Sequence, residues 1–264
     1  MNEATTAARR SELAARVGSG AAMLAVALLA VWLGGLPFWL LVSAAAIIML
    51  IEWFGLVGAS RWQLILALVG LTLALLISGW NALDSRSGTV LMATLGIVAA
   101  LAAATRNVKL AAGVAYVGLP ALAVLAIRAV PDKGFDLTLW TMAVVWATDI
   151  GAFFAGRRFG GLKLAPTISP SKTWAGLFGG MIAAGLIGAG LGVLRELPLI
   201  TSWLGVPLAM VAQMGDLFES ALKRRAGVKD SGNILPGHGG VLDRLDGLVP
   251  VAVLVALLLA AGAL

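Results

Sequence analysis

Apolar runs of about 20 residues recur from one end of this 264-residue chain to the other. A run of that length spans the hydrocarbon core of a bilayer when it forms a helix. Only 12% of the residues are Asp, Glu, Lys or Arg and 60% are hydrophobic, whereas soluble domains carry roughly 25% charged residues. The pattern predicts an all-α, polytopic integral membrane protein. The polar stretches between the runs are too short to form a soluble domain.

The apolar runs predict about nine transmembrane helices in a single membrane domain, residues 1–264. The first run is too long for the apolar core of a signal peptide, so we expect it to be retained behind a basic, cytoplasmic tail at 1–16. Most of the charged motifs fall within 134–246. The predicted helices are, in chain order, 17–34, 36–58, 63–83, 88–104, 109–130, 134–156, 173–194, 197–219 and 246–264.

Basic residues are unevenly divided between the two sides of this arrangement. A cytoplasmic N-terminus puts 15 of the 19 Lys and Arg residues on the cytoplasmic side. The bias follows the positive-inside rule. When the two loops richest in Lys and Arg are left out, 6 basic residues remain on the cytoplasmic side and 4 on the other. We interpret the net charge of +6 as a topology signal and expect no nucleic-acid partner.

Four acidic residues lie in or beside the apolar runs: Glu52, Asp149, Asp216 and Glu219. An ionised side chain inside a membrane helix costs about 2.5–3.5 kcal/mol and is therefore a functional hypothesis. For Glu52, pairing with a neighbouring helix and a role in catalysis are equally open.

The eighth predicted helix carries a polar face at its C-terminal end. The spacing i, i+3, i+4, i+7 puts Asp216, Glu219, Ser220 and Lys223 on one side of the helix. This face indicates a functional site at the membrane boundary. The alternative is a helix end whose side chains pair with one another and reach towards water.

Two further carboxylates indicate a metal site. Asp243 and Asp246 form an i, i+3 pair, with Arg244 between them, if the ninth helix begins there. Together with Asp216 they would offer hard oxygen ligands of the kind that Mg²⁺ prefers. The chain has no cysteine, so thiolate ligands and disulfides are excluded.

Two polar segments are suited to phosphate. In Pro236-Gly-His-Gly-Gly240 the glycines can expose backbone amides, and His238 is the only histidine, which rules out a two-histidine relay. In Ile168-Ser-Pro-Ser-Lys-Thr-Trp-Ala-Gly176 the polar side chains precede the seventh helix, whose N-terminus favours anions. Capping would explain Thr173, but it does not explain Lys172 at the positive end of a helix dipole.

These residues resemble the phosphatidate cytidylyltransferases, or CDP-diacylglycerol synthases, which are integral membrane enzymes. The 27-residue signature of that family is matched by Ser220, Lys223-Arg224, Lys229-Asp230, Gly232, Leu235-Pro236, His238-Gly239-Gly240 and Asp243-Arg244-Leu245-Asp246. Asp149-Ile-Gly-Ala-Phe-Phe-Ala-Gly-Arg157 and Ser169-Pro-Ser-Lys-Thr-Trp-Ala-Gly176 are similar to two further motifs. The chain departs from the family pattern at Ala175, where relatives usually carry Glu or Gln.

The resemblance implies that CTP and phosphatidate react to give CDP-diacylglycerol and pyrophosphate at the cytoplasmic face of a bacterial-type inner membrane. Mg²⁺ is the implied cofactor, with a second cation such as K⁺ left open, as is a homodimer. The expected catalytic residues are Asp216, Lys223, Asp243, Arg244 and Asp246. The expected metal ligands are Asp149, Asp216, Asp243 and Asp246. The expected substrate-binding residues are Ser169, Lys172, Thr173, Ser220, Arg224, Lys229, His238, Gly239 and Gly240.

Two other functions remain open at this point. A CTP-dependent lipid-alcohol kinase would share the membrane setting and the nucleotide, but it would need a base to activate a neutral hydroxyl. An ion-coupled transporter would use Asp149 and Asp216 as cation sites near the membrane midplane. The charges of this chain cluster at one face, which favours an enzyme over a transporter.

Overall fold

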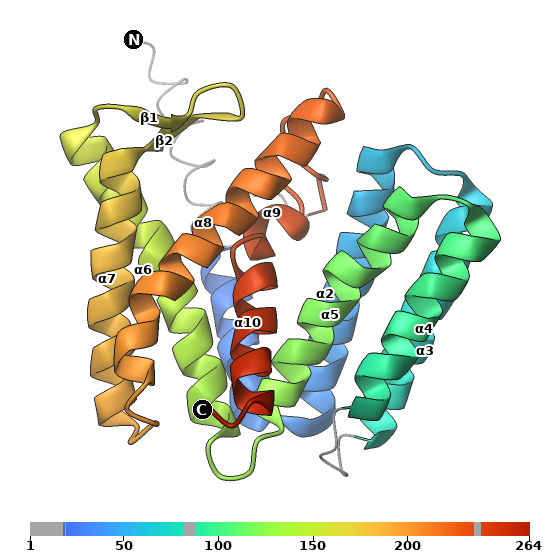
Figure 1. Ribbon diagram of the computed structural model, residues 1–264, viewed down its shortest axis with the longest axis horizontal. Coiled ribbons are helices and arrows are strands. Elements are labelled where there is room, and N and C mark those ends of the chain that lie inside the picture. The colour runs from blue at the N-terminus through green and yellow to red at the C-terminus, as the bar shows by residue number, and fades with distance from the viewer. Residues whose placement is uncertain (1–17, 19, 82–87, 235–238) are drawn as a thin grey trace.

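The computed structural model describes residues 18, 20–81, 88–234 and 239–264, and it is helical almost throughout (Figure 1). After an apolar helix at Gly20–Leu33, the elements are α2 (Gly35–Val57), α3 (Arg61–Asn81), α4 (Gly88–Thr105), α5 (Val108–Arg128), α6 (Gly134–Phe159), β1 (Lys163–Ala165), β2 (Ser169–Thr173), α7 (Trp174–Leu194), α8 (Thr201–Arg225), α9 (Leu242–Leu245) and α10 (Leu248–Ala260). Each predicted membrane helix overlaps one of these helices. Among the described residues, five helices (α2, α3, α5, α6 and α7) are long and apolar enough to cross a membrane. The predicted fold class is confirmed. The predicted tail at 1–16 lies outside the described residues.

The eighth helix is displaced from its predicted bounds of 197–219. It begins at Thr201 and ends at Arg225. Contacts between side chains of its own last turns stabilise the polar C-terminal end. Lys223 Nζ lies 3.2 Å from Glu219 Oε1, which is an i, i+4 ion pair. Three basic residues in the last turn also suit the negative end of the helix dipole.

The predicted ninth helix, 246–264, corresponds to the shorter α10, and the one-turn helix α9 lies just before its predicted start. The residues at the junction, Asp246 and Gly247, keep right-handed helical φ and ψ angles. Asp243 and Asp246 therefore retain the one-turn spacing that the sequence predicts, although Asp246 lies between the two helices.

A short antiparallel hairpin joins α6 to α7, where the sequence predicts only a polar segment. Lys163 of β1 pairs with Thr173 of β2, and Ala165 pairs with Ser169. Thr173 also caps α7, because its Oγ1 accepts a hydrogen bond of 3.0 Å from the Gly176 amide. The hairpin thus holds Lys172 in a defined position immediately before the helix.

Helices α6 and α7 approach each other closely along a row of small residues, which let membrane helices pack tightly. A Cβ on Gly180 would lie 2.8 Å from the Thr148 carbonyl oxygen, and one on Gly176 would lie 3.0 Å from the Ala152 carbonyl oxygen. Trp140 donates a hydrogen bond of 2.8 Å to the Gly188 carbonyl oxygen across the same interface. This packing fixes the hairpin relative to α6.

Helix α10 lies between two groups of helices and contacts α5 on one side and α6 and α8 on the other (Figure 1). Its Val249 belongs to the hydrophobic core formed with α2, α3 and α5. Its Val251 and Val255 belong to the core formed with α6 and α8. The segment that carries Asp243 and Asp246 is therefore held at the junction of both halves of the protein.

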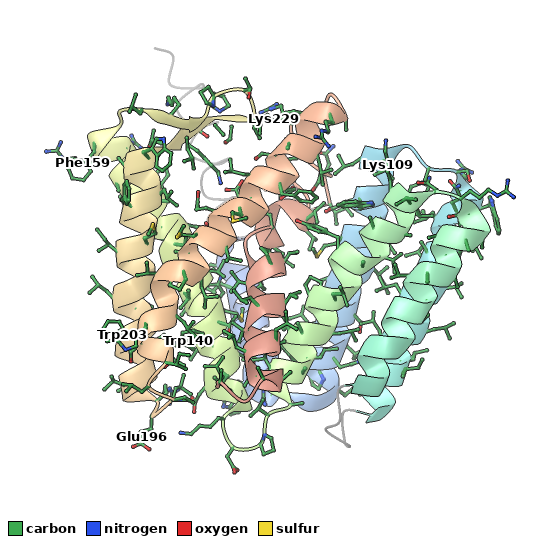
Figure 2. All side chains as sticks on the ribbon, in the orientation of Figure 1. Lys109, Trp140, Phe159, Glu196, Trp203 and Lys229 are labelled. Carbon is green, nitrogen blue, oxygen red and sulfur yellow. The ribbon has the colours of Figure 1, made fainter. Side chains whose placement is uncertain are left out.

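The polar segments gather at one end of the helices. Figure 1 shows the hairpin, the C-terminal end of α8 and α9 at the same end. Figure 2 places Lys109, Phe159 and Lys229 at that end and Glu196 at the opposite one. The hairpin, the end of α8 and α9, which carry many of the predicted site residues, thus lie at one end of the helices.

Candidate active site

The polar face of α8 forms one wall of the site. Ser220 Oγ donates a hydrogen bond of 3.4 Å to Asp216 Oδ1, and Lys223 is paired with Glu219 one turn further on. Glu219 is fully buried and Lys223 is half-buried. The predicted grouping of these four side chains on one side of the helix is confirmed.

Lys223 connects α8 to α9 through Asp243. Its Nζ lies 2.5 Å from Asp243 Oδ1. Asp243 Oδ2 accepts three further hydrogen bonds, from Gly240 N at 2.8 Å, Ser231 N at 2.9 Å and Ser231 Oγ at 3.0 Å. Burial by itself would raise the pKa of Asp243, but the hydrogen bonds from Lys223, Gly240 N and Ser231 N lower this pKa to about 2. Asp243 is therefore ionised, and both of its carboxylate oxygens accept hydrogen bonds from other protein groups.

The hairpin provides the opposite wall. Lys172, at the end of β2, forms an ion pair with Asp216 Oδ2 and donates a hydrogen bond of 3.2 Å to Gln213 Oε1. Arg224 Nε donates a hydrogen bond of 3.3 Å to the Ile168 carbonyl oxygen, which joins the end of α8 to the hairpin. These contacts bring together motifs that are more than 40 positions apart in the sequence.

Asp246 and Asp149 complete the group of charges. Asp246 Oδ1 accepts a hydrogen bond of 2.7 Å from Gly247 N. Burial, reinforced by the negative charge of Asp216, raises the pKa of Asp246 above its usual range. The charges of Asp246, Asp216, Lys172 and Arg244 all act on the carboxyl group of Asp149 in α6. Four separate elements thus meet at a single electrostatic site.

The arrangement of the carboxylates bears on metal binding. Among the described residues, no group of three or more Asp, Glu or His side chains is already positioned to hold a metal ion. The negative charge of Asp216 raises the pKa of Asp246, and a cation close to both carboxylates would offset that charge. Mg²⁺ is commonly held by one or two carboxylates plus substrate phosphates. This pair fits Mg²⁺ better than Asp243, whose oxygens are occupied.

The remaining predicted substrate-binding residues border this site in different ways. Ser169 is buried at the start of β2, whereas Lys229 is exposed beyond the end of α8. Gly239 has a φ of +79°, a backbone conformation that residues other than glycine rarely adopt. His238 lies outside the described residues.

Sequence reasoning left the role of Glu52 open, and the structure gives its contacts. Glu52 of α2 is 4% exposed and accepts hydrogen bonds of 2.9 Å from Val241 N and 2.8 Å from Leu242 N. Among the described residues, its hydrogen-bond partners are these two backbone amides and the Ser231 hydroxyl. The small residues Gly232 and Gly240, which lie against Glu52, are the signal that could have indicated this contact.

Comparisons with known proteins identify the family of this chain. A sequence model of the "Cytidylyltransferase family" matches residues 14–261. The phosphatidate cytidylyltransferase of Brucella suis is 39% identical over 256 residues, which cover 94% of this chain and 93% of that protein. The protein of the same name from Pseudomonas aeruginosa is 45% identical over 131 residues, 48% of each chain. The chain therefore belongs to the cytidylyltransferase family and is a nucleotidyltransferase.

Proposed function

We propose that this protein transfers the CMP moiety of CTP to phosphatidate and releases pyrophosphate, giving CDP-diacylglycerol in phospholipid biosynthesis. The names of its relatives supply the substrates. The observation that carries the proposal is the ion pair between Lys172 of the hairpin and Asp216 of α8, at the end of the helices where the polar segments gather.

The reaction suits a site that acts by charge and position. The phosphate of phosphatidate is a monoester whose second pKa is near 6, so it is largely dianionic at neutral pH. Such a nucleophile needs no protein base, and catalysis then consists of alignment and charge neutralisation. Lys172 and Arg224, with Lys229 and Arg244 beside them, would hold the phosphates.

We further propose that Asp216 and Asp246, with Asp149 nearby, hold Mg²⁺, leaving a second cation such as K⁺ open. When bound, the metal would neutralise charge on the nucleotide phosphates and the leaving pyrophosphate. Lys172, which is paired with Asp216 in the structure, would then be free to contact phosphate. Asp243 is assigned a different task, that of holding Lys223, Ser231 and Gly240.

An apolar cavity supports entry of the lipid from within the membrane. It has a volume of about 80 Å³ and lies between α2, α5 and the start of α10. Leu245 and Leu248, which flank Asp246, form part of its wall. An acyl chain in this cavity would keep the phosphate of its lipid close to the proposed metal site.

The proposed function is tested with purified protein, CTP, phosphatidate and Mg²⁺. We expect CDP-diacylglycerol, identified by mass spectrometry, and pyrophosphate in equal amounts. Both should disappear when EDTA is added and return with excess Mg²⁺. A product formed at the same rate in EDTA would refute the metal-dependent mechanism.

We also propose that the site faces the cytoplasm, because CTP is found there and basic residues are concentrated on that side. Single cysteines at Ser171 and Ala226 are expected to react with a membrane-impermeant maleimide only after spheroplasts of a bacterial host are opened. The wild-type chain has no cysteine, so background labelling is absent.

A cysteine at Leu199, an exposed residue three positions after Glu196, is the matched control, because Glu196 lies at the opposite end of the protein. It should be labelled in intact spheroplasts. Labelling of the Ser171 and Ala226 positions in intact spheroplasts, with protection at Leu199, would reverse the topology.

A further inference from the structure

Glu52 lies in the N-terminal half of the protein, yet its carboxylate contacts the segment that carries the proposed catalytic residues. It accepts hydrogen bonds from Val241 N and Leu242 N, at the start of α9, and one of 3.3 Å from Ser231 Oγ. These three contacts join residues 179 to 190 positions apart. With 4% exposure and both oxygens engaged, Glu52 is placed to hold protein groups and not substrate.

The contacts of Glu52 continue into those of Asp243. Three successive backbone amides point at the two carboxylates: Gly240 N at Asp243, and Val241 N and Leu242 N at Glu52. Ser231 Oγ lies within hydrogen-bond distance of both. We call this group, made of Glu52, Ser231, Asp243 and the amides of 240–242, the loop clamp.

Two glycines, Gly232 and Gly240, leave room for the Glu52 carboxylate in the loop clamp. A Cβ on Gly232 would lie 2.7 Å from Glu52 Oε1, and one on Gly240 would lie 2.6 Å from Glu52 Oε2. Real Cβ atoms essentially never approach so closely, and the buried carboxylate has little room to move. Glycine at both positions is thus matched to an acid at position 52.

We propose that Glu52 is a positioning residue for nucleotidyl transfer. By fixing the backbone of 240–242 it sets the direction of α9, so that Asp243 faces Lys223. This inference rests on the proposed function, because it assumes that these residues serve the reaction. It adds that α2 supplies part of the catalytic geometry from outside the C-terminal motifs.

The test compares Glu52→Gln with wild-type protein by hydrogen exchange and by kinetics. Glutamine keeps the size of the side chain but offers one acceptor oxygen and points an NH₂ donor at a backbone N–H. Exchange of the amides at 240–242 is expected to become about 10-fold faster or more, because their bonds open locally. Since small displacements of catalytic groups can lower rates up to about 100-fold, kcat should fall at least about 10-fold well below the variant's Tm.

Trp53→Phe is the matched control. It removes one hydrogen bond of the neighbouring residue, from Trp53 Nε1 to the Lys109 carbonyl oxygen at 3.1 Å, which does not belong to the loop clamp. It should lower Tm modestly and leave kcat within about twofold of wild type, because a single such bond contributes about 1 kcal/mol. A merely structural role of Glu52 would make its variant behave in the same way.

Gly232→Ala approaches the loop clamp from the other side and keeps the test decisive if Glu52→Gln does not fold. It should reproduce the faster exchange and the lower kcat, and the double variant should lose much less than the product of the two single effects. Wild-type kcat in folded Glu52→Gln, or unchanged exchange at 240–242 in both variants, would overturn the inference. If wild-type protein made no lipid product, the proposed function would fall, and exchange alone would decide whether Glu52 holds the loop.

Discussion

Replacing Asp246 or Asp216 with asparagine is expected to lower kcat about 100-fold each at saturating Mg²⁺, the size of effect seen when one preorganised electrostatic group is lost. Asparagine has the same shape but no charge, so it weakens the attraction for a cation between the two side chains. Asp216→Asn also removes the ion pair with Lys172. The measurement is steady-state turnover of CTP and phosphatidate, together with the Mg²⁺ concentration that gives half-maximal rate.

Asp136→Asn is the control for this experiment. Asp136 makes an ion pair of 3.2 Å with Arg195 at the end of the protein that bears Glu196, remote from the site. The same chemical change there should leave turnover near the wild-type value. Wild-type turnover in Asp246→Asn with an unchanged Mg²⁺ requirement would remove Asp246 from the proposed metal site.

Lys223→Met is expected to destabilise the protein by about 3–5 kcal/mol, the range found when one partner of a buried ion pair is removed. The ammonium group of Lys223 is the cation between Glu219, which is fully buried, and Asp243, whose side chain is 7% exposed. Methionine carries no charge, so both carboxylates would lose the ammonium group that lies between them. Thermal unfolding in detergent should show a fall in Tm on the order of 10 °C, and turnover should be lost with it.

Two further variants identify the cause of that loss. Lys223→Arg keeps the positive charge and should retain most of the stability. Lys223→Met combined with Glu219→Gln removes one of the stranded charges and should be more stable than Lys223→Met alone. A double variant no more stable than the single one would show that packing, and not charge, is the main contribution of Lys223.

Local patterns predicted the helices and the polar face of α8 because both depend on neighbours within a few turns. The apolar runs specify the membrane helices, and the spacing from Asp216 to Lys223 specifies a shared helix side regardless of the rest of the fold. The extension of α8 to Arg225 was missed, since the hydropathy that bounds a membrane helix does not register ion pairs such as Lys223 with Glu219.

Contacts between distant segments could not be predicted in this way. Nothing within the Ser169-Pro-Ser-Lys-Thr173 segment indicates that Lys172 reaches Asp216. The sequence also treats Asp243 and Asp246 as equivalent carboxylates. The structure separates them, because the Ser231 and Gly240 amides and Lys223 converge on Asp243 alone. That distinction depends on how the segment between α8 and α9 folds back against Lys223, which is a contact between distant parts of the sequence.

Cytidylyl transfer is distinguished most directly by following each phosphate of CTP separately. Purified protein with phosphatidate and Mg²⁺ should be given CTP labelled at the α-phosphate in one reaction and at the γ-phosphate in another. If phosphatidate attacks the α-phosphorus, the α-label appears in the lipid and the γ-label appears only in pyrophosphate. A γ-label in the lipid would mean phosphoryl transfer by a kinase, and an unlabelled lipid in both reactions would contradict CDP-diacylglycerol synthesis.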